Sequence, residues 1–103
     1  MTAIVAVAQF FPKPDQKDAF RTAIGIHAAA FRAEDGCELY AVHEAADRFF
    51  AISRWRNADA LAAHAKGAAA QEMRGAVTGL VDRPTEVVRG TPADSSDLTG
   101  ALG

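Results

Sequence analysis

Four polar side chains with rings are the residues of this 103-residue sequence best suited to chemistry: His27, Tyr40, Trp55 and His64. A histidine is the natural base near neutral pH, because its unperturbed pKa is about 6.5. Tyrosine and tryptophan can donate hydrogen bonds while their rings pack against apolar groups. If these side chains meet in an apolar pocket, the pocket suits a flat aromatic ligand held by a few polar groups.

Each of these side chains also has a purely structural interpretation. His27 and His64 could lie in the core or at its rim, and packing is the interpretation that we favour for His27. Trp55 is first of all a large core residue, whose indole N–H needs a partner if it is buried. Tyr40 is open to both interpretations.

Other kinds of chemistry find no support in the sequence. It contains no glycine-rich phosphate loop, no His-Glu-x-x-His and no nucleophile elbow around a serine. Three scattered histidines and the single Cys37 give no paired metal-ligand motif and no disulfide framework. We therefore expect no metal and no organic cofactor.

The composition indicates one small domain, which we place at residues 1–91, followed by a small and polar tail at 92–103 that we expect to be disordered. The net charge of −2 gives no general attraction to nucleic acid or an anionic membrane. No basic leader and no apolar run of about 20 residues is present, so we expect a cytoplasmic protein.

Half of the residues are apolar, but alanine supplies many of them. Either the core is thin or a cavity remains between layers.

The first part of the chain predicts a strand and a helix. Residues 3–11 are apolar on both alternating faces, apart from Gln9, which is typical of a strand covered on both sides. Asp15 is the expected N-cap of a helix over 16–33. Gly25 lies in the middle of this helix at a cost of roughly 1 kcal/mol relative to alanine, which close packing or a pocket wall would explain. The apolar stripe, spaced four, three and four residues, is Phe20, Ile24, His27 and Phe31.

The rest of the domain predicts a hairpin, a broken helix and a last strand. Strands at 37–44 and 48–56 are joined by a short loop. A helix over 57–81 follows, with its first residue, an asparagine, as the N-cap and a break near Gly67. A short strand at 85–89 completes the order β-α-β-β-α-β, the ferredoxin-like α+β pattern.

Right-handed crossovers would place the strands 3–11 and 48–56 at the centre of an antiparallel sheet and the other two strands at its edges. Helices can cover only one face of such a sheet, yet both central strands are apolar on both faces. We therefore expect a homodimer that packs sheet against sheet.

The face on which Tyr40 lies depends on the hairpin loop. An even number of loop residues places it beside Phe49, Ser53 and Trp55, facing the helices, and an odd number places it on the opposite face. In the first case an aromatic and alanine-lined space forms between the sheet and the helices. The candidate substrate-binding residues around it are Phe20, Ile24, His27, Phe31, Phe49, Ser53 and Leu61.

The region from the hairpin to the following helix resembles the antibiotic biosynthesis monooxygenase (ABM) family of small dimeric α+β proteins. The resemblance covers roughly residues 3–91. The residues that carry it are Asp35, Gly36, Cys37, Tyr40, Trp55, Ala60, Leu61 and His64. It implies a dimeric α+β barrel.

The resemblance also implies an activity. Enzymes of this family oxygenate electron-rich aromatics such as anthrones and quinols without a metal or an organic cofactor, because the deprotonated substrate itself gives an electron to O2. On this basis the candidate catalytic residues are His64, Trp55 and Tyr40. His64 would be the base, with His27 as the second candidate, and Trp55 and Tyr40 would position the substrate or stabilise the developing anion.

Two alternatives remain. Ser53 and Ala69 stand where many relatives carry a glutamate and a second histidine, which favours a non-catalytic dimeric module that binds a small hydrophobic metabolite. An RNA-recognition domain shares the order of elements, and its third-strand signature is matched at Arg48, Phe50 and Ala51 but not at its glycine or its second stacking aromatic. The incomplete match to this signature and the net negative charge of the chain make RNA binding a distant third hypothesis.

Overall fold

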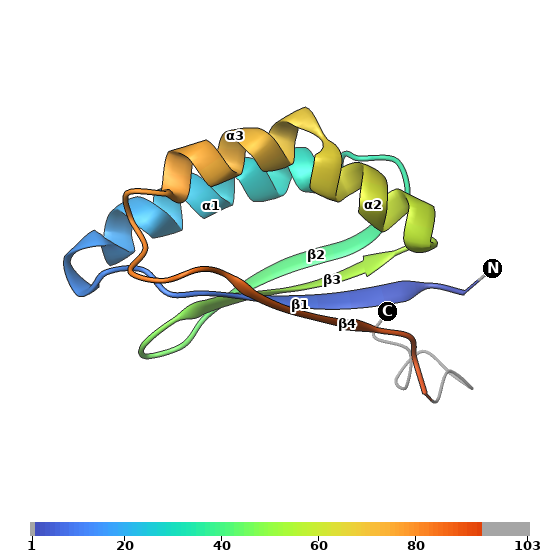
Figure 1. Ribbon diagram of the computed structural model, residues 1–103, viewed down its shortest axis with the longest axis horizontal. Helices are drawn as coiled ribbons and strands as arrows, with labels where there is room; N and C mark the ends of the chain where they lie inside the picture. Colours follow the sequence, from blue (N-terminus) through green and yellow to red (C-terminus); the bar gives the residue numbers. More distant parts are fainter. Residues whose placement is uncertain (1, 94–103) are drawn as a thin grey trace.

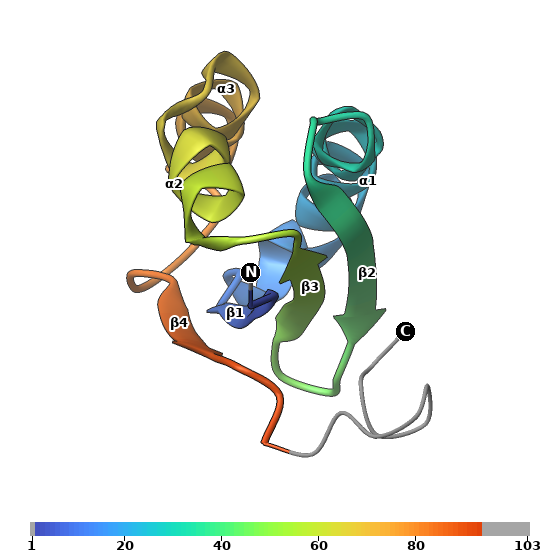
Figure 2. The ribbon, with the colours of Figure 1, turned by 90° about the vertical axis from the view of Figure 1, so that its right-hand side faces the viewer.

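Helices cover one face of a four-stranded antiparallel sheet, as the sequence predicts (Figures 1 and 2). The computed structural model describes residues 2–93, so nearly all of the tail expected to be disordered lies outside the described residues. The elements are β1 (Ile4–Phe10), a 3-10 turn η1 (Pro14–Gln16), α1 (Lys17–Arg32), β2 (Cys37–Glu44), β3 (Phe49–Trp55), α2 (Ala58–Lys66), α3 (Ala68–Val77) and β4 (Glu86–Gly90).

The strand order is β2-β3-β1-β4, which confirms the predicted central and edge strands. The hairpin loop holds four residues, 45–48, and Tyr40 pairs with Ser53 across the two strands. Because paired residues point to the same face, the Tyr40 side chain faces the helices together with Ser53 and Trp55. In Figure 2, α1 lies over the β2 and β3 side of the sheet, and α2 and α3 lie over the β1 and β4 side.

Two of the predicted helix boundaries are correct and two are wrong, one of them because α3 ends at Val77 and not at residue 81. Asn57 caps α2, since its side-chain oxygen accepts a hydrogen bond from the Ala60 amide at 2.9 Å. The break between α2 and α3 falls at Gly67, as expected. Asp15 is not the cap of α1: it lies inside η1, and Gln16 precedes α1 without a side-chain capping bond. The extra 3-10 turn moves the helix start past the residue that the capping preference selects.

The core is aromatic, and its largest fully buried side chains are Trp55, Phe20, Phe31, Phe49 and Ile24. The expected stripe of α1 is correct except at His27, which is half-buried, while Ala28 is 1% exposed. At 100° per residue, positions 27 and 28 lie on either side of the stripe at similar angles, so the periodicity cannot choose between them. The small side chain is the one that faces the core.

The sheet face away from the helices is apolar along its centre. It carries alternate residues of β1, β3 and β4, which are Val5, Val7, Phe50, Ile52 and Val88. Val88 is 66% exposed. Arg54 lies on the same face, and its Nε donates to Glu38 at 2.8 Å. Within residues 2–93, no helix has the length and apolar character that crossing a membrane requires.

Two glycines give opposite predictions for the free energy of unfolding. Gly36 has a φ of 84°, and a Cβ there would lie 2.5 Å from the Ala60 Cβ. We expect Gly36→Ala to lower the free energy of unfolding by about 1–3 kcal/mol, through backbone strain and this clash. Gly25 has open space around it, so neither close packing nor a pocket wall explains the glycine at this position. Gly25→Ala should therefore raise the free energy of unfolding by about 1 kcal/mol.

Urea denaturation of both variants beside the wild type measures these changes. A Gly36→Ala protein as stable as the wild type, or a Gly25→Ala protein that is less stable, would contradict the described backbone at that position.

Candidate active site

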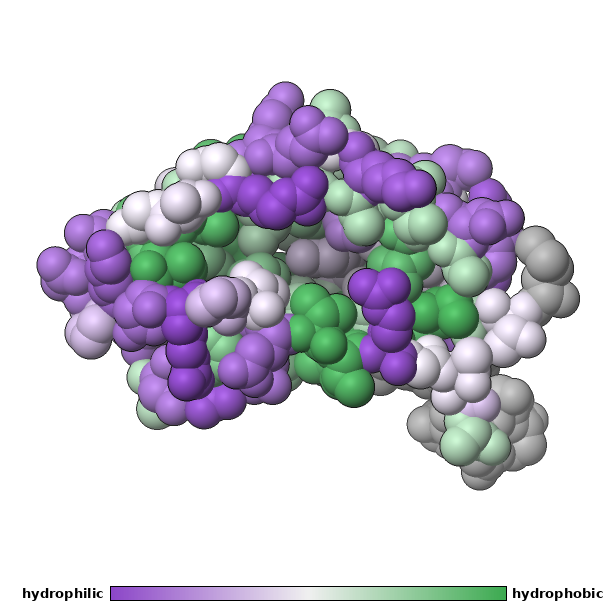
Figure 3. Space-filling model, viewed as in Figure 1, coloured by the Kyte–Doolittle hydropathy of each residue, from purple (hydrophilic) through white to green (hydrophobic). Residues whose placement is uncertain are grey.

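A cavity of about 290 Å3 lies between the sheet and helices α2 and α3. Figure 3 shows it as a hollow on the face of the molecule where β4 runs below the helices. Five of its lining residues are alanines: Ala6, Ala8, Ala51, Ala65 and Ala70. Small side chains from both layers leave the space unfilled, so the alanine-rich composition produces a cavity between layers.

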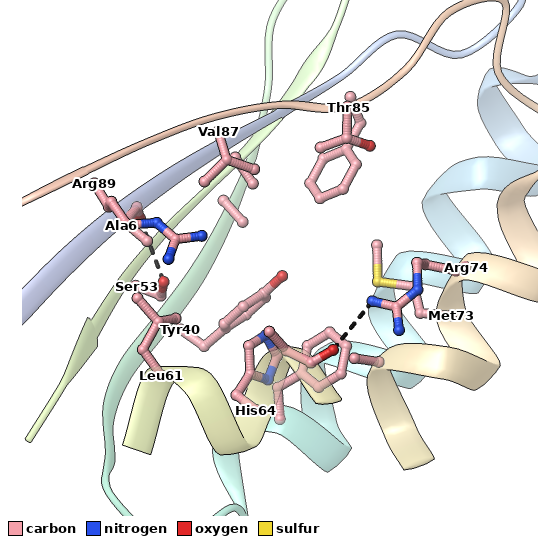
Figure 4. A pocket seen from close by; sticks show the side chains of 16 residues that line it. Ala6, Tyr40, Ser53, Leu61, His64, Met73, Arg74, Thr85, Val87 and Arg89 are labelled. Carbon is pink, nitrogen blue, oxygen red and sulfur yellow. Dashed lines mark hydrogen bonds between the residues drawn. The ribbon is translucent and has the colours of Figure 1, made fainter. Parts of the chain in front are cut away.

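Most of the cavity wall is apolar, and its polar groups come from both layers (Figure 4). They are Tyr40, Ser53, His64, Arg74, Thr85 and Arg89. An apolar cavity with a few convergent polar groups is typical of a site for a small molecule.

His64 is held at the wall of this cavity by three neighbours. Its ring stacks on Trp55 at a centroid distance of 4.4 Å and meets the edge of Phe31 at 4.6 Å. Its Nδ1 lies 2.7 Å from Oε1 of Glu34, and the His64 side chain is 15% exposed. A carboxylate can only accept, so Nδ1 carries the hydrogen of this bond. The lone pair of the neutral imidazole is then on Nε2, which is the ring nitrogen able to take a proton.

Trp55 lies behind His64 and is fully buried. Its indole N–H donates to Oγ of Ser53 at 3.0 Å, and the Ser53 hydroxyl donates to the backbone oxygen of Ala6 at 3.3 Å. Ser53 is thus the partner that a buried tryptophan needs. The chain of bonds ties β3 to β1 directly under the cavity.

Tyr40 places a hydroxyl in the cavity (Figure 4). Its ring packs against the edge of Phe31 at 5.0 Å. Burial raises the pKa of Tyr40 to about 12, so the phenol is protonated at neutral pH. Within residues 2–93 its hydroxyl has no hydrogen-bond partner, so it can donate to a bound molecule.

The structure brings together some of the predicted site residues and separates others. Phe31, Tyr40, Ser53, Leu61 and His64 line the cavity. The remaining predicted residues lie outside its lining and are Phe20, Ile24, His27, Phe49 and Trp55. Of these, Phe20 and Phe49 pack on each other at 5.0 Å in the core, and His27 is half-buried on α1.

Four polar residues at the site were missed by the sequence analysis: Glu34, Arg74, Thr85 and Arg89. Glu34 lies 30 positions before His64, and no local pattern links the two residues. Arg89 could have been found, because it alternates with Val87 on the face of β4 that pairs with Ala6 and Ala8. In the part of the chain that the structure describes, no three His, Cys, Asp or Glu side chains are grouped to hold a metal ion.

Comparisons with known proteins agree with this fold. The sequence profile of the family described as antibiotic biosynthesis monooxygenase matches residues 3–76. The chain is similar to the Mycobacterium tuberculosis protein "Putative monooxygenase Rv0793", with 35% identity over 99 residues that cover 93% of this chain and 98% of the relative. The solved structure of that protein superimposes with a TM-score of 0.86 at 30% identity, covering 93% of this chain and all of the relative (100%).

More distant structures share the fold. A protein from Pseudomonas aeruginosa has a TM-score of 0.82 at 21% identity, with 91% of this chain and 97% of that chain covered. A conserved protein from Methanosarcina mazei has a TM-score of 0.81 at 22% identity, with coverages of 87% and 92%. At these identities the likeness concerns the fold alone.

The single tyrosine of the sequence allows a direct test of the environment of Tyr40. We expect its tyrosinate absorbance to appear with a midpoint near pH 12 in the folded protein and near pH 10 in urea. Because the folded-state pKa is the higher one, this group stabilises the fold fully below about pH 10 and loses its contribution as the pH rises to about 12. A midpoint near 10 in the folded protein would contradict a buried phenol.

Proposed function

The chain belongs to the antibiotic biosynthesis monooxygenase family, and from this premise we propose that it oxidises an electron-rich aromatic small molecule with O2 in the cavity under α2 and α3. The observation that carries the proposal is His64, whose ring is fixed by Trp55, Phe31 and Glu34 at the wall of an apolar cavity. A fixed imidazole with a free Nε2 can act as a base towards a bound ring.

The reaction balances without a further reductant. For an anthrone-like substrate, His64 takes a proton from the activated CH2 group, and the resulting anion gives one electron to O2. The substrate radical and superoxide then combine in a C–O bond, the resulting peroxide anion takes the proton back from His64, and the hydroperoxide loses water to leave C=O. In sum, CH2 and O2 become C=O and H2O, and all the electrons that reduce O2 come from the substrate.

The side chains around the cavity have different roles in this reaction. Glu34 accepts from Nδ1 and so stabilises the imidazolium that forms when Nε2 takes the proton. The protonated Tyr40 hydroxyl donates to the oxygen on which the negative charge of the substrate develops. The alanine walls admit a flat ring and keep water from it.

A second candidate function is a non-catalytic module of the same fold that binds a hydrophobic metabolite. The observation that favours it is the use of Ser53, whose hydroxyl is bonded to Trp55 and Ala6 and so is not available to a ligand. In a binding module, His64 would contribute to affinity but not to turnover.

We further propose that two copies of the chain pack through the apolar sheet face. An isolated sheet would leave Val5, Val7, Phe50, Ile52 and Val88 facing water. Burial of such a face is the ordinary driving force for association. Family members with this fold commonly form dimers.

Sedimentation velocity tests the dimer. The wild type should sediment as a dimer, and Ile52→Lys should sediment as a monomer, because a charge on β3 would be buried in the interface. Ile26→Lys is the matched control, since Ile26 is 66% exposed on α1, away from the sheet face. A monomeric wild type, or an Ile52→Lys protein that stays dimeric, would contradict this interface.

Oxygen consumption tests the proposed reaction. Purified metal-free protein should accelerate O2 uptake by a panel of anthrones and quinols, and His64→Ala should lose at least about 100-fold of that rate, the usual contribution of a general base. Glu34→Gln should lower kcat with little change in KM, because it removes the charge that stabilises the imidazolium but not a contact with the substrate.

His27→Ala is the matched control for the base, since His27 lies outside the cavity lining, and it should keep the wild-type rate. Uptake no faster than spontaneous autoxidation across the panel would argue against the oxygenase and favour the binding module. A loss of rate in His27→Ala but not in His64→Ala would assign the base to His27.

A further inference from the structure

Arg74 of α3 and Arg89 of β4 line the cavity but have no part in the reaction described above. In Figure 4 their guanidinium groups lie on opposite sides of the cavity, with Tyr40 and His64 between them and the helices below. Among the described residues that line the cavity, they are the only two with a permanent charge, and none is an aspartate or a glutamate. The cavity is therefore cationic although the chain as a whole is acidic.

Most other arginines are engaged with carboxylates. Four of the eight arginines form ion pairs, which are Arg21 with Asp18 and Glu44, Arg48 with Asp47, Arg54 with Glu38, and Arg56 with Asp35. Arg32 donates to a backbone oxygen and Arg83 lies over the Phe11 ring, and neither lines the cavity.

The two cavity arginines differ from this pattern. Arg74 has one hydrogen bond, from Nη1 to the backbone oxygen of Ala65 at 3.3 Å, and no carboxylate partner within residues 2–93. Arg89 makes neither a hydrogen bond nor an ion pair with any described residue. Both guanidinium groups therefore keep donors that a ligand can use.

An anion is the natural partner for such groups. The planar fork of a guanidinium matches a carboxylate or sulfonate with two parallel N–H donors. Beside an apolar wall the attraction is stronger than in bulk water, because the local dielectric constant is lower. The alanines of the cavity offer room for an apolar ring but no hydrogen bond to an acid.

We propose that the ligand of this cavity is an aromatic acid. Its ring lies against the alanine wall beside His64 and Tyr40, and its carboxylate or other acidic group is held by Arg74 and Arg89, whose exposed side chains turn towards it from the two sides of the cavity. The inference rests on the proposed function only in taking this cavity as the ligand site, and it holds whether the ring is oxidised or simply bound. The arginines then fix the orientation of the ring and select acids over neutral aromatics of the same size.

Two fluorescent probes with one aromatic frame test this selection by equilibrium titration. 1-Anilinonaphthalene-8-sulfonate carries an acid, and N-phenyl-1-naphthylamine is the same frame without it. The wild type should bind the sulfonate at least about 10-fold more tightly at low ionic strength, as expected for a charge-assisted hydrogen bond. Added salt should reduce this advantage.

Substitutions of the two arginines test whether they cause the tighter binding of the sulfonate. Arg74→Gln and Arg89→Gln should each weaken the sulfonate several-fold and leave the Kd of the neutral probe unchanged, and the double variant should bind the two probes equally. Arg56→Gln is the matched control, because Arg56 is an exposed arginine outside this cavity and should leave both Kd values unchanged. All of these side chains are exposed, so the fold should tolerate the changes.

The inference would be overturned if the sulfonate does not bind, if the wild type binds both probes equally, or if the preference survives in the double variant. Binding is measured without turnover, so these outcomes are separate from those of the oxygen-uptake experiment. A protein that prefers the sulfonate but consumes no O2 would support the aromatic-acid ligand and contradict the oxygenase.

Discussion

The position of the His64 ring depends on contacts from three parts of the chain, and most features of the site follow from it. Trp55 at the end of β3 supplies the stacking surface, Phe31 of α1 supplies an edge, and Glu34 after α1 supplies the hydrogen bond to Nδ1. Trp55 can serve as that surface only because Ser53 satisfies its buried N–H. A base that is fixed in this way does not need to be ordered by the ligand, which lowers the entropic cost of reaching a reactive geometry.

The cavity beside this ring is a consequence of composition. Alanines stand on both layers where larger side chains would close the space, and the aromatic core built on Phe20 and Phe49 lies to one side of it. Packed aromatic side chains thus stabilise the fold in one part of the space between the sheet and the helices, while the other part stays open as the cavity. The arginines follow the same division: Arg21, Arg54 and Arg56 pair with carboxylates elsewhere, whereas Arg74 and Arg89 at the cavity have no carboxylate partner among the described residues.

Local sequence signals were enough for the fold and for part of the site. The order of strands and helices, the cap at Asn57 and the break at Gly67 follow from periodicity and from the preferences of single residues. The same kind of signal failed at Asp15, where a 3-10 turn intervenes. It also failed at His27, where two neighbouring positions fit the stripe equally well.

The partners of the site residues could not be predicted, because they depend on contacts that are distant in the sequence. The bond between Glu34 and His64 forms only when the end of α1 meets α2. Similarly, the position of Ser53 on β3 predicts a substrate-binding residue, and only the packed structure shows its hydroxyl bonded to the indole of Trp55. Sequence periodicity assigns a residue to a face, but the partner of its polar atom is set by the packing of elements.

The measurement that bears most directly on His64 as a base is the absorption spectrum of an anthrone-like substrate bound to the protein with oxygen excluded. Without O2 the reaction stops after proton transfer, so the wild type should show the band of the substrate anion. His64→Ala should still bind the substrate but show the spectrum of its neutral form. An anion band of equal strength in both proteins, or in neither, would contradict proton transfer to His64.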